Sequence, residues 1–340
     1  MKAMKTPHGL MLACAFLLTS CSSSRVLPAA VRSATTTTSS TTTTSSTPTA
    51  RDPSAQWSDG PPLPVAVSEV GVGSLGQEIH VLGGYVGGVA HSRSHQVYDV
   101  RTKLWRTAAP LPQSLDHIAV VGLAGKIYAA GGYGATGRPT SFLYAYDPKT
   151  DRWSTRASLP LARAAAVAVV LRNQLHLVGG KGPSGDTGEH DVYDPIADHW
   201  SFAAPMSTAR DHAAGAVLAD HIYVAAGRPG SLAVGEVYDP ETDRWTNLPS
   251  LPLPRSSVAG AAFHGRFLVI GGEDASEQNV FTTVDAFDPA TGRWSQLPPL
   301  PHGVQGTGAA VIGAELFVPG GGPTGGGSKQ SSRLQVLASG

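Results

Sequence analysis

Cysteine is almost absent from this sequence. Its 340 residues include only two, Cys14 and Cys21. Cys14 lies in a segment that begins with Lys2 and Lys5 and continues as a short apolar run, the pattern of a cleaved export signal. Cys21 would then be the only cysteine of the mature chain, which excludes an internal disulfide and any catalytic thiol further along the chain.

Charged residues are also scarce, at 15% of the chain, and 25 basic residues balance 25 acidic ones. Without Lys2 and Lys5 the mature chain keeps 23 basic residues against 25 acidic ones, and no basic stripe of the kind that binds nucleic acid. We therefore expect no nucleic-acid partner. The glycine-rich stretch Gly320–Gly327 has no Gly-Lys-Ser/Thr motif after it, and no Gly-x-Ser-x-Gly motif occurs. A phosphate loop and a serine-hydrolase elbow are therefore excluded.

Long apolar runs are missing as well. The run from Leu10 to Leu18 is too short to span a bilayer, so residues 1–20 are predicted to be a signal peptide. Leu18-Thr19-Ser20-Cys21 resembles a bacterial lipobox, which implies a lipid on Cys21; the alternative is a plain signal peptide with an incidental cysteine. Residues 21–53, mostly Ser, Thr, Ala and Pro, are predicted to be a disordered tether. We expect a chain anchored on the outer side of the bacterial cytoplasmic membrane or in the cell envelope.

Glycine is abundant, with 40 residues, and much of it falls in a repeat. The tryptophans Trp57, Trp105, Trp153, Trp200, Trp245 and Trp294 are spaced 48, 48, 47, 45 and 49 residues apart. A Gly-Gly pair, or Ala-Gly once, follows each of them after 26 residues, and an aromatic residue precedes each of the last five by seven. Six copies of such a period with short strands predict an all-β fold, a six-bladed β-propeller over residues 54–340.

Each repeat is predicted to hold four strands, A to D. In the second repeat these are Asp116–Leu123, Lys126–Ala130, Phe142–Tyr146 and Arg152–Thr155. The sixth repeat has no outer strand and no tryptophan after its third strand. Gln56–Ser58 lies at the other end of the chain. We therefore predict that this N-terminal strand closes the last blade.

The segments IYAAGG…YDPKTDRW, IYVAAG…YDPETDRW and LVIGG…FDPATGRW resemble the kelch repeat. The resemblance covers Trp57 to about Leu337. It implies a kelch-type propeller whose B–C and D–A connections open on the same rim. The B–C connections are also where the repeats differ in length, and insertions on one face indicate a binding face.

The resemblance also implies which residues bind a ligand. Kelch domains that bind peptides or sugars use the residue after the Gly pair, an Arg deeper in the B–C loop, and the first residue of strand A. The first position gives Tyr85, Tyr133, Lys181, Arg228 and Glu273. The second gives Arg138, with Arg93 as a looser match. The third gives Ser68, Asp116, Ala164, Asp211, Ser256 and Gln305.

Histidine offers two further patterns. His91 and His95 have the spacing of a helical zinc motif, but glycines flank them, so solvated loop histidines are predicted instead. Asp116-His117 and Asp211-His212 resemble acid/base pairs. Because neighbours on a strand point to opposite faces, neither is predicted to act as a dyad. No catalytic residue, metal site or cofactor is assigned.

Two functions remain open at this stage. The first is a membrane-anchored, monomeric binding or scaffold protein that recognises a protein segment or a glycan through the B–C/D–A rim. The second is an extracytoplasmic carbohydrate-active enzyme resembling the kelch-type sialic-acid mutarotases. A closed pocket with convergent carboxylates would favour the enzyme, and a broad open rim would favour the binder.

Overall fold

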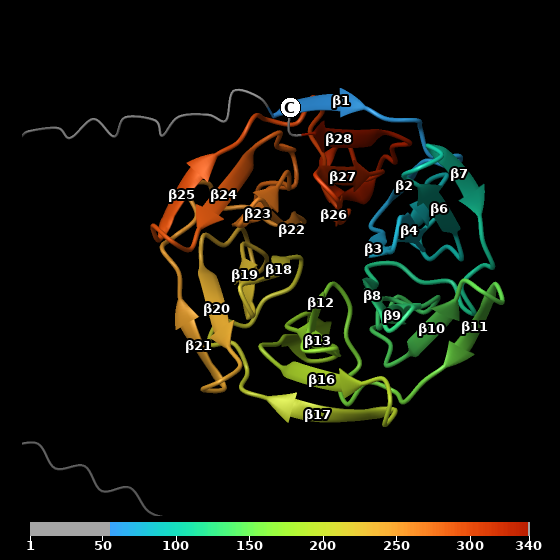
Figure 1. Ribbon diagram of the computed structural model, residues 1–340, viewed down its shortest axis with the longest axis horizontal. Helices are drawn as coiled ribbons and strands as arrows, with labels where there is room; N and C mark the ends of the chain where they lie inside the picture. The colour runs from blue at the N-terminus through green and yellow to red at the C-terminus, as the bar shows by residue number, and fades with distance from the viewer. Residues whose placement is uncertain (1–54, 339–340) are drawn as a thin grey trace, which may run out of the picture. The chain divides into compact units, whose positions relative to one another are not determined.

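The computed structural model describes residues 55–338, which form six four-stranded antiparallel sheets around a central axis (Figure 1). The predicted six-bladed β-propeller is therefore confirmed. The signal peptide, Cys21 and the tether lie outside the described residues. Within the described part of the chain, no helix is long and apolar enough to cross a bilayer.

In each of the first five blades the strands are numbered from the axis outward. Blade 1 comprises β3 (Gly71–Leu75), β4 (Glu78–Leu82), β6 (His95–Asp99) and β7 (Leu104–Thr107). Blade 2 comprises β8 (Ala119–Leu123), β9 (Lys126–Ala130), β10 (Leu143–Asp147) and β11 (Arg152–Thr155). Blade 3 comprises β12 (Val167–Leu171), β13 (Gln174–Val178), β16 (His190–Asp194) and β17 (His199–Ala203).

The remaining blades follow the same plan. Blade 4 comprises β18 (Ala214–Leu218), β19 (His221–Ala225), β20 (Gly235–Asp239) and β21 (Arg244–Asn247). Blade 5 comprises β22 (Ala259–Phe263), β23 (Arg266–Ile270), β24 (Val284–Asp288) and β25 (Arg293–Gln296). Blade 6 comprises β26 (Ala310–Ile312), β27 (Glu315–Pro319), β28 (Leu334–Ala338) and β1 (Gln56–Asp59).

The two ends of the described chain meet in blade 6. There β1 pairs antiparallel with β28, with Trp57 opposite Leu337, and forms the outer strand of that sheet. The prediction that an N-terminal strand closes the ring is confirmed. Closure matters because an open ring would leave two blade faces without an apolar partner.

The outer edge of the ring is held by the repeated aromatic pairs. In blade 2, Tyr146 and Trp153 are cross-strand partners with ring centroids 5.3 Å apart. Trp153 Nε1 donates a hydrogen bond to the carbonyl of Ala109, in the connection that leaves blade 1. The other five tryptophans make the same kind of bond, to Pro61, Ala157, Ala204, Pro249 and Pro298. Each blade is thus linked to the preceding blade at the outer edge of the ring.

An aspartate in the C–D turn adds a second hydrogen bond to this link, but only where the preceding connection offers a backbone N–H. Asp151 accepts from the Tyr146 hydroxyl at 2.7 Å and from the Ala109 amide at 2.8 Å. Asp198 and Asp243 do the same for Ala157 and Ala204. In the turns that face Pro61 and Pro249, Lys103 and Gly292 stand in the aspartate's place. Proline has no amide hydrogen, so an aspartate there would have no backbone amide to accept.

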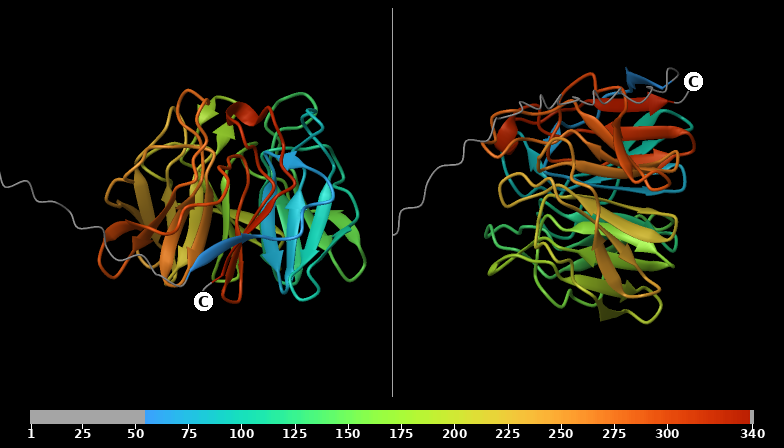
Figure 2. Two further views of the ribbon diagram at one scale, coloured as in Figure 1. Left: turned by 90° about the horizontal axis from the view of Figure 1, so that it is seen from above. Right: turned by 90° about the vertical axis from the view of Figure 1, so that its left-hand side faces the viewer.

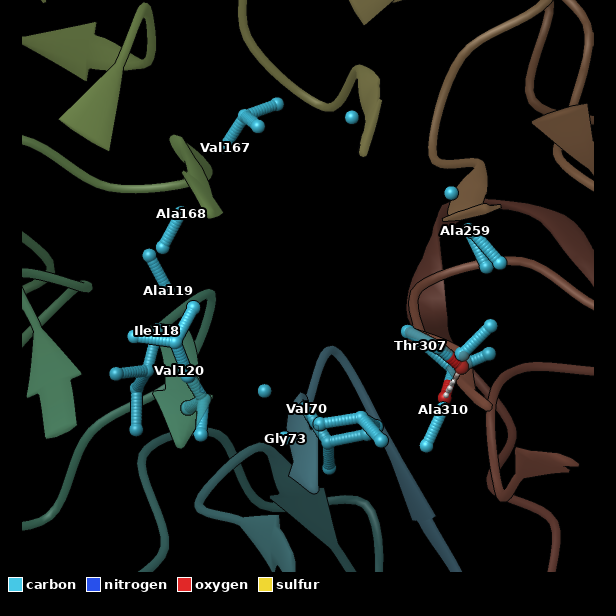
Figure 3. A pocket seen from close by; sticks show the side chains of 18 of the residues that line it. Val70, Gly73, Ile118, Ala119, Val120, Val167, Ala168, Ala259, Thr307 and Ala310 are labelled. Atoms are coloured by element: carbon cyan, nitrogen blue, oxygen red, sulfur yellow. Dashed lines mark hydrogen bonds between the residues drawn. The ribbon is translucent and has the colours of Figure 1, made fainter. Parts of the chain in front are cut away.

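The inner strands approach so closely that small residues are required. A Cβ on Gly260 would lie 2.4 Å from the Gly215 nitrogen, and one on Gly122 would lie 2.0 Å from the Ser74 oxygen. The inner strands enclose an axial cavity of about 360 Å³. Figure 3 shows its wall, made of small apolar side chains such as Val70, Ala168 and Ala310.

Three buried arginines brace the connections that lead into blades 3, 4 and 5. Arg163, Arg210 and Arg255 are almost fully buried and pair with Asp191, Glu236 and Asp285. They also donate to backbone carbonyls of the strand B ends. A buried guanidinium is costly unless its charge is paired and hydrogen-bonded in this way. These arginines hold the rim loops in place from inside the protein.

The B–C and D–A connections gather at one end of the ring. Figure 2 shows the short 3-10 turn η1 (Gly325–Gly327), part of the last B–C connection, among the loops at that end. Two small two-stranded sheets also lie there, formed by β2 (Val67–Ser68) with β5 (Tyr85–Val86) and by β14 (Lys181–Gly182) with β15 (Gly185–Asp186).

Candidate functional site

Two of the three predicted ligand positions lie side by side in every blade. The first residue predicted for strand A bridges to the residue that follows the Gly pair. The pairs are Ser68 with Tyr85, Asp116 with Tyr133, Ala164 with Lys181, Asp211 with Arg228, Ser256 with Glu273, and Gln305 with Gly322. The structure therefore brings Tyr85, Asp116, Tyr133, Lys181, Asp211, Arg228 and Glu273 together around one end of the axis. We call this end the axial mouth.

Strand A itself starts later than predicted. In blade 2, β8 begins at Ala119 rather than Asp116, because His117 has φ of 49° and leaves the extended conformation. The equivalent residues of the other blades share this left-handed backbone. They are Glu69, Ala165, His212, Ser257 and Gly306, with φ between 51° and 60°.

We call these six residues the left-handed ring. Backbone hydrogen bonds connect its residues from one blade to the next. The amide of His117 donates to the Glu69 carbonyl at 3.0 Å, Ala165 to His117 at 2.9 Å, and His212 to Ala165 at 3.0 Å. Because the backbone is the same in all six blades, the ring is a property of the fold. The six side chains differ, so the chemistry of the axial mouth is particular to this chain.

The prediction that the two Asp-His neighbours form no dyad is wrong. His117 Nδ1 lies 2.6 Å from Asp116 Oδ1, and His212 Nδ1 lies 2.6 Å from Asp211 Oδ1. Alternation of side chains applies only to extended backbone, and the left-handed histidines turn their rings back toward the preceding aspartate. Asp116 and Asp211 are buried, and their contacts with Nδ1 fix the orientation of the two histidine rings.

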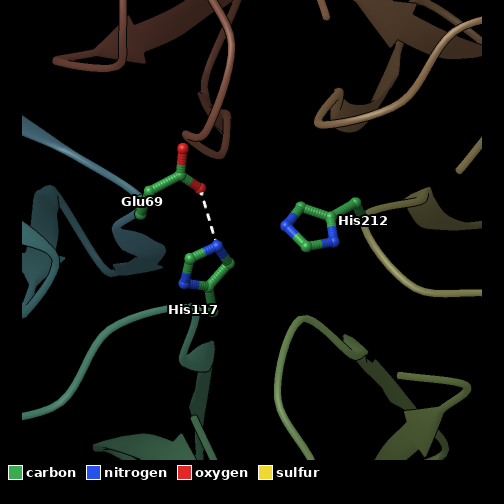
Figure 4. A group of neighbouring side chains, drawn as sticks. All are labelled: Glu69, His117 and His212. Atoms are coloured by element: carbon green, nitrogen blue, oxygen red, sulfur yellow. Dashed lines mark ion pairs between the residues drawn. The ribbon is translucent and has the colours of Figure 1, made fainter. Parts of the chain in front are cut away.

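The two histidines meet a third side chain over the axis. Figure 4 shows Glu69, His117 and His212 pointing toward one another from three different blades. Glu69 Oε2 lies 3.0 Å from His117 Nε2, and the two imidazole centroids lie 4.9 Å apart. Sequence reasoning missed this group. Its signal was that Glu69, His117 and His212 each follow the first predicted residue of a strand A.

Electrostatics at this cluster strongly favour charge on Glu69 and His117. Burial would raise the pKa of Glu69, but the charge and hydrogen bond of His117 outweigh it and lower that pKa to about 2. Burial opposes protonation of His117, yet Glu69 and Asp116 raise its pKa to about 10. Burial would also raise the pKa of Asp211, but its contact with His212 lowers that pKa to about 2.

Two tyrosines flank His117. The ring centroid of Tyr133 lies 5.3 Å and that of Tyr85 6.0 Å from the His117 ring, both edge to face. Both tyrosines are half-buried. Burial, with the nearby Asp116 and Glu69 carboxylates, raises the pKa of the Tyr85 hydroxyl to about 12. The axial mouth therefore presents two neutral aromatic rings beside the histidine.

The predicted cations of the axial mouth are held by carboxylates. Lys181 Nζ lies 2.7 Å from Asp186 and 3.8 Å from Asp211. Arg228 lies 2.6 Å from Glu273 and 2.8 Å from Glu277. These pairs fix the positions of both cations, and each keeps part of its surface exposed. Glu273 is itself buried and also accepts from the Gly326 amide at 2.9 Å.

The loop arginines have different surroundings. Arg138 is exposed at the tip of the blade 2 B–C loop, and its carbonyl accepts from the Gly134 amide at 3.1 Å. Within residues 55–338, its side chain has no ion-pair partner. Arg93 is also exposed, but its Nε donates to the Leu111 carbonyl, so it braces its own loop.

The expectation of solvated histidines at positions 91 and 95 is wrong for both. His91 Nδ1 lies 2.5 Å from Asp116 Oδ2, at the axial mouth. His95 lies on β6, is buried, and its Nε2 lies 2.9 Å from His80 Nδ1. The two side chains serve different parts of the fold and share no site.

The ring of four-stranded blades defines a six-bladed β-propeller, with polar side chains gathered at the axial mouth. The sequence comparison gives its family. Residues 67–250 match the family described as the KLHDC2/KLHL20/DRC7 Kelch-repeats domain, and residues 254–301 match the Kelch motif. The chain belongs to the kelch-repeat family.

The solved structures extend the comparison of the fold. The structure of YjhT superposes with a TM-score of 0.71 at 17% sequence identity, covering 81% of this chain and 95% of that one. At that identity the likeness concerns the fold. No curated protein matches the chain.

Proposed function

We propose that this protein is a membrane-anchored, extracytoplasmic binding protein whose ligand sits over the axial mouth. One observation carries the proposal. Half-exposed Tyr85, Tyr133, Lys181 and Arg228 converge there from four blades. Lys181 and Arg228 are held by carboxylates, Asp186 and Glu273. Polar groups fixed in advance lose little entropy on binding, which is what a specific recognition surface needs.

A glycan is the ligand that these groups suit best. Tyrosine rings offer flat apolar surface with a polar hydroxyl, and fixed charged groups can exchange hydrogen bonds with sugar hydroxyls. The cations are already paired with carboxylates, so the axial mouth offers no free clamp for a strongly acidic ligand. An extended protein segment is the second ligand class for the same surface.

A glycan array probed with the purified protein tests this proposal. We expect saturable binding to a sugar, weakened tenfold or more by Tyr133→Ala because one stacking surface is lost. Lys103→Ala is the matched control, since Lys103 lies in a C–D turn at the opposite end of the ring. Equal affinity in the Tyr133 variant and the wild type would move the ligand away from the axial mouth.

The anchoring part of the proposal rests on sequence residues 1–53. Export, lipidation of Cys21 and a Ser/Thr-rich tether together would hold the propeller outside the membrane. One acyl chain binds a bilayer only marginally, so lipoproteins carry more than one. We expect Cys21→Ser to release the protein into the medium or leave it unprocessed. Unchanged membrane retention would contradict the lipid anchor.

The two Asp-His pairs favour an enzyme as a second candidate. Asp116–His117 and Asp211–His212 place imidazoles, each oriented by a carboxylate, beside Glu69 at the mouth of the cavity. Such groups can exchange protons with a sugar hydroxyl. NMR exchange spectroscopy of reducing sugars would detect accelerated interconversion of anomers. Acceleration lost in His117→Gln and kept in Lys103→Ala would support the enzyme, and no acceleration by the wild type would reject it.

A further inference from the structure

We propose that Glu69, His117 and His212 form a binding site for one Zn²⁺ ion at the axial mouth. One ligand atom from each of these side chains lies within 4.8 Å of the other two. Among residues 55–338, no other group of three such side chains comes as close together. Two imidazoles and one carboxylate are a donor set that zinc takes in catalytic sites, with the fourth position open.

The aspartates give each histidine the orientation that a metal needs. Their carboxylates lie 2.6 Å from Nδ1 of His117 and of His212. Figure 4 shows the other ring nitrogen, Nε2, of both histidines facing the shared space next to Glu69. In metal proteins a carboxylate on the far nitrogen fixes the ring and makes it a better donor. Here both far nitrogens have that partner.

The surroundings leave room for the Glu69 carboxylate. A Cβ on Gly306 would lie 2.4 Å from Glu69 Oε1, and one on Gly327 would lie 2.9 Å from the same atom. Both glycines come from the connections of blade 6 and have left-handed backbone. Blade 6 therefore contributes no side chain at these positions, and the carboxylate from blade 1 occupies the vacated space.

Zinc binding requires the three donor atoms to move slightly closer together as a group. With zinc about 2.0 Å from each donor, two tetrahedral ligands lie about 3.3 Å apart. Glu69 Oε2 and His117 Nε2 are already 3.0 Å apart. The movement that brings all three donor atoms to zinc-binding distance would therefore come from His212, whose ring lines the axial cavity.

Charge also favours a dication. Glu69, Asp116 and Asp211 place three negative charges against the two imidazoles. Lys181 lies 3.8 Å from Asp211 and offsets part of this charge. A metal-bound imidazole nitrogen carries no hydrogen, so Zn²⁺ binding at Nε2 of His117 would release to solvent any proton held there. The open fourth position of the ion would face the mouth and accept water or an oxygen atom of a ligand. The zinc proposal does not rest on the proposed glycan binding, since all three zinc ligands belong to the protein.

Calorimetric titration with ZnCl₂ tests the site. The full chain is extracted in detergent, stripped with EDTA and dialysed before titration. We expect saturable binding of one Zn²⁺ per chain, weakened at least 100-fold in Glu69→Gln and in His212→Gln. Asp211→Asn, which removes only the orienting charge, should weaken binding about 10- to 100-fold with unchanged stoichiometry. His199→Gln is the control, because His199 is exposed on the outer strand β17.

A second measurement uses only the wild-type protein, so it tests the site even where a variant fails to fold. Co²⁺ added to the wild-type protein should give visible absorption bands of a four-coordinate site, and one equivalent of Zn²⁺ should abolish them. Absence of saturable Zn²⁺ binding to the wild type would overturn the proposal. So would affinity that is unchanged in folded Glu69→Gln and His212→Gln. A loss equal to theirs in His199→Gln would place the ion elsewhere and also overturn it.

Discussion

The outer edge and the axial mouth use the sixfold repeat in opposite ways. At the outer edge every blade performs the same task with the same residue, because six tryptophans donate to six backbone carbonyls of the preceding connection. At the axial mouth the backbone repeats, but the side chains at equivalent positions are Glu69, His117, Ala165, His212, Ser257 and Gly306.

The difference shows where the fold tolerates variation. The tryptophan indole is itself part of the link between blades, so its identity is constrained. At the axial mouth the links are backbone hydrogen bonds, which any residue can make if it accepts a left-handed backbone. Side chains there can change without opening the ring, so function can be placed on them.

The largest expected effect breaks the outer edge at its closing strand. Deleting Arg51–Leu63 removes β1 and Trp57, leaving β28 as an unpaired edge. It also removes Leu63, which is buried. We expect thermal denaturation to show a much lower melting temperature, or no cooperative unfolding. Deletion of Ser22–Ala50 is the control and should change the melting temperature little. Equal effects of the two deletions would contradict closure by β1.

The next prediction breaks one internal link of the same edge. Trp200 is buried, packs against Tyr193 with ring centroids 5.1 Å apart, and donates to the Ala157 carbonyl at 2.9 Å. Trp200→Ala should lower the free energy of unfolding by about 3–5 kcal/mol. Urea denaturation measures this. A loss below about 1 kcal/mol would show that the outer edge is not what holds the blades together.

A third prediction concerns pH and two histidine pairs that lie between the outer edge and the axis. His80 Nδ1 contacts His95 Nε2 at 2.9 Å, and His176 Nδ1 contacts His190 Nε2 at 2.8 Å. All four rings are buried. Burial lowers their pKa values to about 3 for His80 and His190 and about 4 for His95 and His176.

Because these folded-state pKa values lie below the unfolded value of about 6.5, the unfolded chain takes up protons first. The stabilisation is complete above pH 6.5 and falls as pH drops from 6.5 toward 4. The upper limit is about 1.4 kcal/mol per histidine for each pH unit. Denaturant unfolding between pH 7 and 4.5 measures the slope. His176→Gln with His190→Gln should flatten it, and an unchanged slope in that double variant would assign the pH dependence to other groups.

The smallest effect on stability is expected at the tip of a rim loop. Arg138→Ala should change the free energy of unfolding by no more than about 0.5 kcal/mol, because the side chain is exposed. Chemical denaturation measures this against Lys103→Ala, another exposed residue. A loss above about 1 kcal/mol would mean that the blade 2 loop is part of the core structure.

The sequence alone determined most of the fold. The tryptophan spacing, the Gly pairs and the missing outer strand of the sixth repeat predicted six blades closed by Gln56–Ser58, and the structure has β1 pairing with β28. It also placed Tyr133, Asp116, Arg228 and Asp211 on one rim, because a repeat puts equivalent residues at equivalent places. The structure pairs Tyr133 with Asp116 and Arg228 with Asp211. These signals are local and recur six times, so each copy supports the others.

Only the tertiary structure decided what the axial mouth contains. The alternation rule separated His117 from Asp116, because it assumes an extended backbone that the left-handed ring does not have. Glu69, His117 and His212 come from blades 1, 2 and 4. They meet because the ring closes around them. Within a single repeat each of the three is an ordinary polar residue beside a strand, so no local pattern reveals that they converge on one point.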